Sequence, residues 1–223
     1  MKGAADPQPP ILAKPRWRGV SHQWAFFASI GLGIALSITA PSGRATGAAV
    51  VYSACVALLF GTSALYHRIN WRSMSGRRWM RRLDHSAIFL LIAGSYTPFA
   101  LLVIEGTLAD VILAVVWTGA AAGIVLKLAW VDAPNWVTAL IYVMLGWVTA
   151  AAAPDLLSGL GPVGAGMVAL GGVFYTVGAV VYATRRPDPV PDVFGYHEVF
   201  HVLVIAAAGL QYAVVAFWAI PGG

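Results

Sequence analysis

The chain contains seven segments that are long and apolar enough to cross the hydrocarbon core of a bilayer, which takes about 20 predominantly apolar residues. They lie at roughly 23–40, 47–67, 84–104, 108–130, 136–154, 161–183 and 197–220. Hydrophobic residues make up 59% of the 223 positions and charged residues 10%, whereas soluble domains carry about 25% charged residues. We therefore expect an all-α membrane protein, a seven-helix transmembrane bundle with no second soluble domain.

The lysine and arginine residues are distributed very unevenly over the connections between these spans. With the N-terminus in the cytoplasm, thirteen of the 14 lie on the cytoplasmic side and Arg44 alone lies on the other. Cytoplasmic loops are enriched in these residues, so we expect a cytoplasmic N-terminus and an extracytoplasmic C-terminus. The predicted parts are a short cytoplasmic tail at 1–22, a single transmembrane domain at 23–220 and a basic cytoplasmic loop at 68–83. Because the tail has no apolar region followed by a cleavage site, it is not predicted to be a signal peptide.

The net charge of +5 is explained by this orientation signal, so no nucleic-acid partner is expected. In the basic loop, Trp71 and Trp79 accompany the arginines, a combination suited to the surface of an anionic cytoplasmic leaflet. The expected partners are membrane lipids, and the sequence indicates no protein partner. The expected location is the plasma membrane, crossed several times. The single Cys55 excludes an intramolecular disulfide and is expected to be buried.

Ionisable residues within or at the ends of spans mark a functional site by default, because placing them in a membrane is costly. In this chain they gather at the ends of three spans. SALYH closes the second span, RRLDHSAIF opens the third and HEVFH opens the seventh. The predicted topology brings these three ends to the cytoplasmic side, so we expect one shared site there.

The histidines of these segments have the spacing of metal ligands. His197 and His201 lie one helical turn apart, so they share one face of a helix and can bind one ion. With His67 as a third imidazole, the set predicts a zinc site whose fourth position is open to water, as in catalytic sites. Zinc lowers the pKa of bound water to about 7. Asp84 could hold and deprotonate that water, and Ser63 could donate to the water, a ligand or an oxyanion.

Several of these residues also have a simpler interpretation. The three histidines could be unrelated residues at the membrane interface, and Asp84 could be the N-cap of the third span. His22 and His85 are expected to be interfacial anchors. On a helix, His85 points about 100° away from Asp84, so it is expected to face another neighbour. Elsewhere, Gln211 is expected to form an interhelical hydrogen bond, and Pro98 to kink the third span and open a cavity.

Glu198 lies inside HEVFH, where soluble zinc proteases have their general base. Asp84 on another helix is available for that role. We therefore favour a role for Glu198 in the first turn of the seventh helix or as a partner of loop arginines, over that of a catalytic base. An intramembrane metalloprotease is the lesser alternative, because such enzymes take a third ligand from a later span and HEVFH lies in the last one.

Together the three segments resemble the hemolysin III group of the progestin and adipoQ receptor family, in a seven-span superfamily with the adiponectin receptors and alkaline ceramidases. The motifs are Ser63–His67 (SALYH), Asp84 within RRLDHSAIFLLIAGSYTPF and His197–His201 (HEVFHVLV), and with the span count they cover residues 20–220. The resemblance implies a cytoplasmic N-terminus and one zinc ion. The implied ligands are His67, His197 and His201, with Asp84 and Ser63 around the water at the open position.

Eukaryotic relatives in the superfamily are linked to hydrolysis of ceramide amide bonds, and the bacterial group is named for a haemolytic phenotype. The resemblance therefore implies a zinc-dependent hydrolase of a lipid amide or related acyl bond, with a lipid substrate that enters between helices. The chain lacks the long N-terminal domain of the adiponectin receptors and any external ligand platform, so a receptor function carries over least. The main alternative is a non-catalytic sensor, transporter or cytolytic protein in which zinc fastens helices together.

Overall fold

The computed structural model describes residues 14–223, and the regular elements in that part of the chain are helices. Within the same residues, the only β-pairing is an isolated bridge between Val190 and Phe194. The first part of the predicted tail, 1–13, lies outside the described residues. The elements are α1 (Val20–Ile38), α2 (Gly43–Arg68), α3 (Met74–Leu102), α4 (Gly106–Ala129), α5 (Asn135–Gly146), the 3-10 helix η1 (Trp147–Ala152), α6 (Ala153–Thr184), α7 (Tyr196–Val214) and the π-helix η2 (Val215–Ala219).

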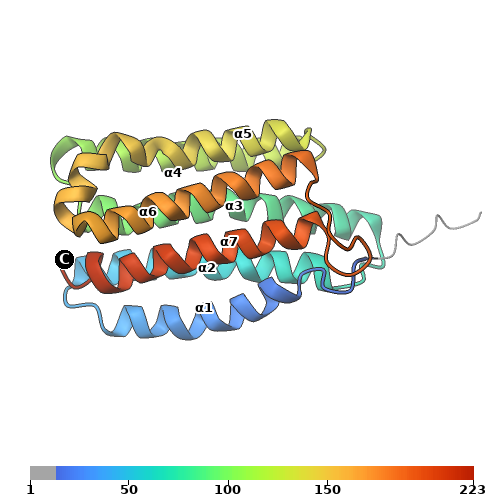
Figure 1. Cartoon of the computed structure of the whole chain (residues 1–223), viewed down its shortest axis with the longest axis horizontal. Helices are drawn as coiled ribbons and strands as arrows, with labels where there is room; N and C mark the ends of the chain where they lie inside the picture. Colours follow the sequence, from blue (N-terminus) through green and yellow to red (C-terminus); the bar gives the residue numbers. More distant parts are fainter. Residues whose placement is uncertain (1–13) are drawn as a thin grey trace, which may run out of the picture.

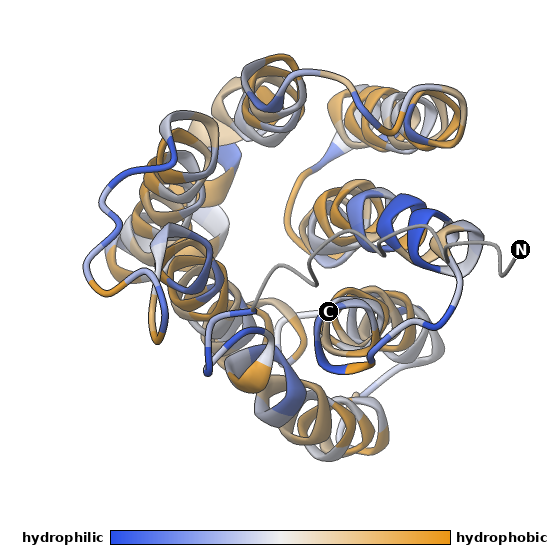
Figure 2. Ribbon diagram, turned by 90° about the vertical axis from the view of Figure 1, so that its right-hand side faces the viewer, coloured by the Kyte–Doolittle hydropathy of each residue, from blue (hydrophilic) through white to orange (hydrophobic). Residues whose placement is uncertain are grey.

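The helices run up and down in one bundle, so that neighbours in sequence are also neighbours in space (Figure 1). The first helix, α1, also contacts the last, α7, which closes the ring of helices seen along the bundle in Figure 2. Among the helices long and apolar enough to cross a membrane, α3 is the most enclosed, with 72% of its 18-residue apolar stretch buried. It approaches α2 closely at Gly94, where a Cβ atom would lie 2.5 Å from the Cβ of Cys55. Cys55 is buried, as predicted.

Five helical stretches are long and apolar enough to cross a membrane: Gly43–Arg68, Met74–Leu102, Gly106–Ala129, Asn135–Thr184 and Tyr196–Ala219. The fourth has 50 residues and contains both α5 and α6, which pack side by side (Figure 1). Helix α1 has 19 residues and is not among the five. Large apolar side chains are exposed on many of these helices, as expected where a bundle faces lipid. The fold is therefore that of an all-helical membrane protein.

The start of α3 corrects the prediction of a basic loop at 68–83. Helix α2 ends at Arg68 and α3 begins at Met74, so only residues 69–73 are non-helical. Ser73 is the N-cap of α3, and its side chain accepts a hydrogen bond from a backbone N–H of the first turn. Hydropathy misses residues 74–83 of this helix because arginine is polar, although arginine is a good helix former. The interpretation of Asp84 as an N-cap is also wrong, because Asp84 lies inside α3.

The connection between α5 and α6 is helical as well, although the predicted spans at 136–154 and 161–183 leave residues 155–160 outside both. Helix α6 begins at Ala153 with Pro154 in its first turn, where the missing N–H of proline has no helical partner to lose. Gly161 then interrupts the helix with φ 67° and ψ 175°, a conformation that suits glycine. Residues 153–160 therefore form a short helix ahead of the long part of α6, whose start agrees with the predicted span at 161–183.

Two predictions about the interior of the bundle can be compared with the structure. The Tyr175 hydroxyl on α6 donates to Gln211 Oε1 on α7 at 3.3 Å, which confirms the predicted interhelical hydrogen bond. Pro98 lies inside α3. Its neighbours Ser95 and Phe99 line a cavity at the centre of the bundle.

Candidate metal centre

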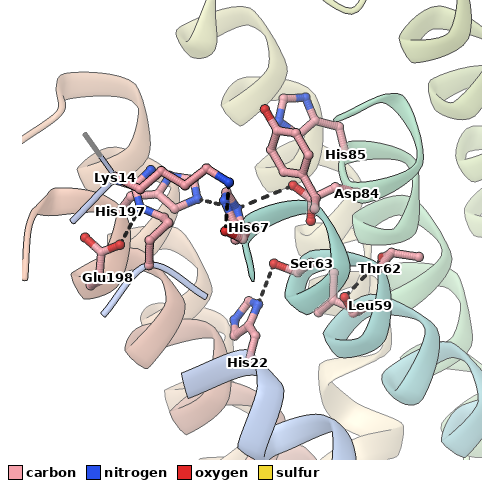
Figure 3. Close-up of polar contacts among 12 residues, drawn as sticks. Lys14, His22, Leu59, Thr62, Ser63, His67, Asp84, His85, His197 and Glu198 are labelled. Atoms are coloured by element: carbon pink, nitrogen blue, oxygen red, sulfur yellow. Dashed lines mark hydrogen bonds and ion pairs between the residues drawn. The ribbon is translucent and has the colours of Figure 1, made fainter. Parts of the chain in front are cut away.

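Three imidazoles from α2 and α7 meet at one end of the bundle. His67 lies in the last turn of α2, and His197 and His201 lie one turn apart at the start of α7. All three side chains are buried, and one nitrogen of each ring lies within 4.8 Å of those of the other two. His197 Nε2 lies 3.0 Å from His67 Nε2 (Figure 3). The two segments, far apart in the sequence, thus form one nitrogen cluster.

A carboxylate and a hydroxyl group lie next to this cluster. Asp84, from α3, places its Oδ2 atom 3.8 Å from His67 Nε2. Ser63 lies one turn before His67 on α2, so the two side chains share a face of that helix. Both Asp84 and Ser63 are buried. The structure therefore brings together all five predicted site residues: His67, His197, His201, Asp84 and Ser63.

His22 belongs to the same cluster, so the prediction that it is an interfacial anchor is wrong. It lies in the first turn of α1 and is only 2% exposed. Its Nδ1 atom lies 2.8 Å from Ser63 Oγ (Figure 3). Its ring stacks on that of His201, with centroids 3.7 Å apart and planes 13° apart. The predicted topology contained the signal that would have found it, since α1 starts on the same side as the other polar span ends.

His85 is also buried rather than interfacial, with 8% of its surface exposed. Its ring centroid lies 6.3 Å from that of Tyr182 on α6, and its Nδ1 atom has no hydrogen-bond partner among the described residues. The prediction that His85 faces a different neighbour from Asp84 is therefore confirmed. It lines the cavity but is not part of the imidazole cluster.

Glu198 points away from the imidazoles and holds the start of α7 (Figure 3). Its Oε2 atom accepts a hydrogen bond from the Gly195 N–H at 2.8 Å, and its Oε1 atom pairs with Arg18 Nε at 2.5 Å. The Glu198 side chain is 2% exposed and that of Arg18 is 21% exposed. The two predicted roles, in the first helical turn and as an arginine partner, are therefore both confirmed. The arginine comes from the segment before α1.

That segment, residues 14–19, lies across this end of the bundle, and we call it the N-terminal strap. The backbone N–H groups of Arg16 and Trp17 donate to carbonyls in the connection between α6 and α7, at 3.0 and 3.1 Å. The Lys14 ammonium donates to the backbone carbonyl of His67 at 3.2 Å. Burial lowers the pKa of Lys14, and the neighbouring arginines lower it further. The strap thus connects α2 to the residues that precede α7.

Gly19, at the junction of the strap and α1, sets how closely the strap approaches the site. Its φ angle of 76° lies in the left-handed region that glycine adopts easily. A Cβ atom at this position would lie 2.6 Å from the Cβ of His67. Glycine is therefore required both by the backbone conformation and by the contact with His67.

A cavity of about 120 Å³ extends from the cluster into the bundle. Its polar end includes Ser63, Asp84, His197 and His201. Most of the remaining wall is apolar or aromatic and comes from α2, α3, α5, α6 and α7. These wall residues include Leu59, Ile88, Leu91, Ile92, Phe99, Tyr142, Val143, Val168, Phe200 and Val204. The polar cluster therefore lies at the end of a largely apolar chamber.

Known proteins are similar in sequence to this chain over most of its length. The family model described as haemolysin-III related matches residues 11–212. The chain belongs to the haemolysin-III related family. Among curated relatives, Hemolysin-3 of Bacillus cereus is 33% identical over 202 residues, which cover 86% of this chain and 89% of the relative. The Hemolysin-3 homolog of Bacillus subtilis (strain 168) is 31% identical over 170 residues, 76% of each chain.

The imidazole cluster of this haemolysin-III related chain has the dimensions of a metal site. Ligand nitrogens at about 2.0–2.1 Å from a tetrahedral ion lie about 3.4 Å from one another. The observed separations, 3.0 Å from His197 Nε2 to His67 Nε2 and at most 4.8 Å within the trio, span this value. His201 Nδ1 is buried without a hydrogen-bond partner among the described residues, so this ring is not committed to another polar group through that atom. The cluster can therefore hold one metal ion.

Proposed function

We propose that this protein is an intramembrane zinc-dependent hydrolase of a lipid amide or related acyl bond. One observation carries the proposal: three buried imidazoles meet the Asp84 carboxylate at the end of a largely apolar cavity. Imidazole nitrogen suits zinc among the divalent metals, and three such ligands leave a position for substrate or water. The ligands would be His67, His197 and His201.

The chemistry divides among the residues of the cluster. A zinc ion held by His67, His197 and His201 would supply a Lewis acid that polarises a carbonyl oxygen and a water that is nucleophilic near neutral pH. Asp84 accepts a proton from the attacking water as the new carbon–oxygen bond forms, and it returns the proton to the leaving amine or alcohol as the acyl bond breaks. Ser63 donates its hydroxyl proton in a hydrogen bond to the oxyanion that develops on the carbonyl.

The cavity supports a lipid as substrate. Its wall is mostly apolar, and the only carboxylate among its lining residues, Asp84, lies at the cluster, so an acyl chain could lie in the chamber with its carbonyl at the cluster. The bundle carries exposed apolar side chains on its outside, which suits entry from the membrane between helices. The plasma membrane is the proposed location, and lipids are the proposed partners.

The catalytic proposal can be tested with purified protein in lipid nanodiscs. We expect one zinc ion per chain in the wild type and in Asp84→Asn, and hydrolysis of an N-acyl or O-acyl lipid by the wild type. Hydrolysis by Asp84→Asn should be slower by a factor on the order of 100 or more, as for loss of a general base. Asp155→Asn, far from the site, should retain full activity. Zinc-loaded wild type that leaves a broad lipid panel intact would contradict the proposal.

We also propose that all seven α-helices cross the membrane, with the N-terminus in the cytoplasm. The distribution of lysine and arginine supports this orientation. In a Cys55→Ser background, single cysteines at Ser75, in the first turn of α3, and at Asp155, in the first turn of α6, test it. We expect a membrane-impermeant maleimide to label intact cells only at position 155. Labelling at position 75 and not at position 155 would show that the orientation is opposite to the one proposed.

A non-catalytic function is the alternative, and it is favoured by the placement of the ligands on α2 and α7, which a zinc ion would fasten together. In that case chelation should unfold the protein, and no lipid would be cleaved. Leakage of liposomes at physiological protein density would point to a cytolytic or channel function.

A metalloprotease has less support, because Glu198 is engaged with Arg18 and Gly195. Full activity in Glu198→Gln would exclude the metalloprotease hypothesis, because that mechanism needs Glu198 as the general base.

A further inference from the structure

We propose that His22 is a positioning residue of the metal centre, one that orients both the Ser63 hydroxyl and the His201 ring from a fourth helix, α1. The inference rests on the proposed metal site and goes beyond its three ligands. Two contacts carry it: the 2.8 Å hydrogen bond between His22 Nδ1 and Ser63 Oγ and the 3.7 Å stacking of the His22 and His201 rings.

The stacking contact fixes the plane of a ligand. The His22 and His201 rings are nearly parallel, at 13°, and both are buried. His22 also makes an edge-to-face contact with Phe60 on α2, with centroids 5.0 Å apart. A buried ring with two aromatic neighbours has little freedom to rotate. His201 is therefore supported from α1, whereas its own helix determines only where its Cβ atom lies.

The hydrogen bond fixes the direction of the Ser63 hydroxyl. A serine hydroxyl carries one proton and two lone pairs and rotates freely unless a partner holds it. If His22 Nδ1–H donates to Ser63 Oγ, the Ser63 proton stays available for the cavity, where an oxyanion would develop. In the other tautomer, the Ser63 proton points at His22 and the oxygen lone pairs face the cavity. In either case, His22 decides what Ser63 presents there.

An apolar ring would pack at this position at lower cost than imidazole. The second ring nitrogen of His22, Nε2, is buried and has no hydrogen-bond partner among the described residues. Leaving such a buried group unpaired is unfavourable, and phenylalanine would avoid this cost while keeping an aromatic ring against His201. The imidazole is present despite this cost, and its Nδ1 atom contacts Ser63. We therefore attribute the histidine to its contact with Ser63 and not to the packing of α1.

The test measures metal binding rather than turnover, using cobalt(II) as a spectroscopic probe. Wild type, His22→Ala, His22→Phe and the control His85→Phe are purified in detergent, and each is titrated with cobalt under chelator competition. His85→Phe is the matched control, because it removes a buried imidazole that lines the same cavity without touching Ser63 or His201. Outer-shell partners of metal ligands typically change affinity by about 10–100-fold. We expect a loss of that size in His22→Ala, with a changed visible spectrum, and less than a threefold change in His85→Phe.

The variant His22→Phe separates the two contacts and guards against a folding defect in His22→Ala. It keeps a ring that can stack on His201, so we expect a weaker effect on affinity, on the order of a few fold. In a Ser63→Ala background, adding His22→Phe should change cobalt affinity by less than twofold, because the hydrogen bond is already absent. Equal effects in the two backgrounds would contradict action through Ser63.

The results also separate this inference from the proposed function. If the wild type binds no cobalt or zinc, the metal site itself is wrong. If the wild type binds cobalt and both His22 variants match its affinity within twofold and its spectrum, the metal site stands and the positioning role of His22 is wrong.

Discussion

The two ends of the bundle differ sharply in how they accommodate polar groups. At the site end, where α2 ends and α7 begins, buried imidazoles, a carboxylate and a hydroxyl form a connected cluster, and the strap adds the Arg18–Glu198 ion pair. At the opposite end, the charged residues are few: Arg44, Glu105, Asp110 and Asp155. Among the described residues, none of these four forms an ion pair.

This difference shows where the fold bears the cost of polar burial. Buried polar groups need partners, so the site end requires matched contributions from α1, α2, α3, α7 and the strap. The opposite end needs only exposed charges on helix ends and short connections. Substitutions at the site end should therefore reduce metal binding or stability more strongly the more buried the replaced group or its partner is. Substitutions of exposed charged residues should have small effects.

The largest expected effect is loss of the metal on removal of a ligand. His67→Ala takes away one of three nitrogen donors, so we expect zinc affinity to fall by more than the roughly 100-fold upper range of outer-shell changes. The zinc content of the purified protein should fall from one ion per chain to below about 0.1. Elemental analysis of purified protein measures it, with Asp155→Asn as the control from the opposite end. Equal zinc in the two variants would erase the proposed difference between the ends.

The second-largest effect is expected for Gly19→Ala, a substitution that changes no charge. It places a Cβ atom 2.6 Å from the Cβ of His67 and forces alanine into a φ of 76°, so we expect a destabilisation of about 3 kcal/mol. Thermal unfolding followed by tryptophan fluorescence measures it. The matched control is Gly31→Ala on the same helix, where no atom lies within 4 Å of the added Cβ. That variant should be as stable as wild type or slightly more stable, and similar losses in both would contradict the argument.

Breaking the ion pair of the strap should have a smaller effect. Arg18→Ala leaves Glu198 buried and unpaired, although Arg18 itself is 21% exposed. We therefore expect a loss of about 2 kcal/mol, below the roughly 3–5 kcal/mol of a fully buried pair. Arg16→Ala is the control, because it removes an exposed positive charge from the same segment and leaves its backbone hydrogen bond in place. If Arg16→Ala is equally destabilised, net charge rather than the pair explains the effect.

The smallest effect is expected at an exposed ion pair of the site end itself. Asp132 bonds Arg81 at 2.7 Å and Arg78 at 3.1 Å, but its side chain is 57% exposed. Such pairs contribute little and are screened by salt. Asp132→Asn should therefore leave the melting temperature and the zinc content unchanged, and a clear loss in either would show that burial is not what sets the ranking.

The sequence predicted the parts of the site that follow a rule of spacing. His197 and His201 are one helical turn apart, as are Ser63 and His67, and the charge distribution placed their span ends together. For His22 the charge distribution gives only the end of the bundle at which it lies, because a single histidine in a first turn has no spacing to reveal its partners. Its contacts depend on how α1 rotates and leans against α2 and α7.

The helix boundaries show a second limit. Hydropathy located the apolar core of each helix well, but it placed the start of α3 at residue 84, whereas the helix begins at Met74. Helical hydrogen bonds continue through polar sequence when a cap and good helix formers are present. Residues 155–160, which lie between the predicted fifth and sixth spans, are also helical, in a stretch that has Pro154 in its first turn.

The placement of the proposed metal ligands on α2 and α7 has a consequence for how the protein is made. A membrane protein is synthesised from its N-terminus, so His67 and Asp84 enter the bilayer long before His197 and His201 have left the ribosome. Until the final helix inserts, these early polar groups lack the partners they have in the finished bundle. Arrival of the last helix therefore both completes the ring and ends that interval of exposure, which makes it the step at which a nascent chain becomes able to retain an ion.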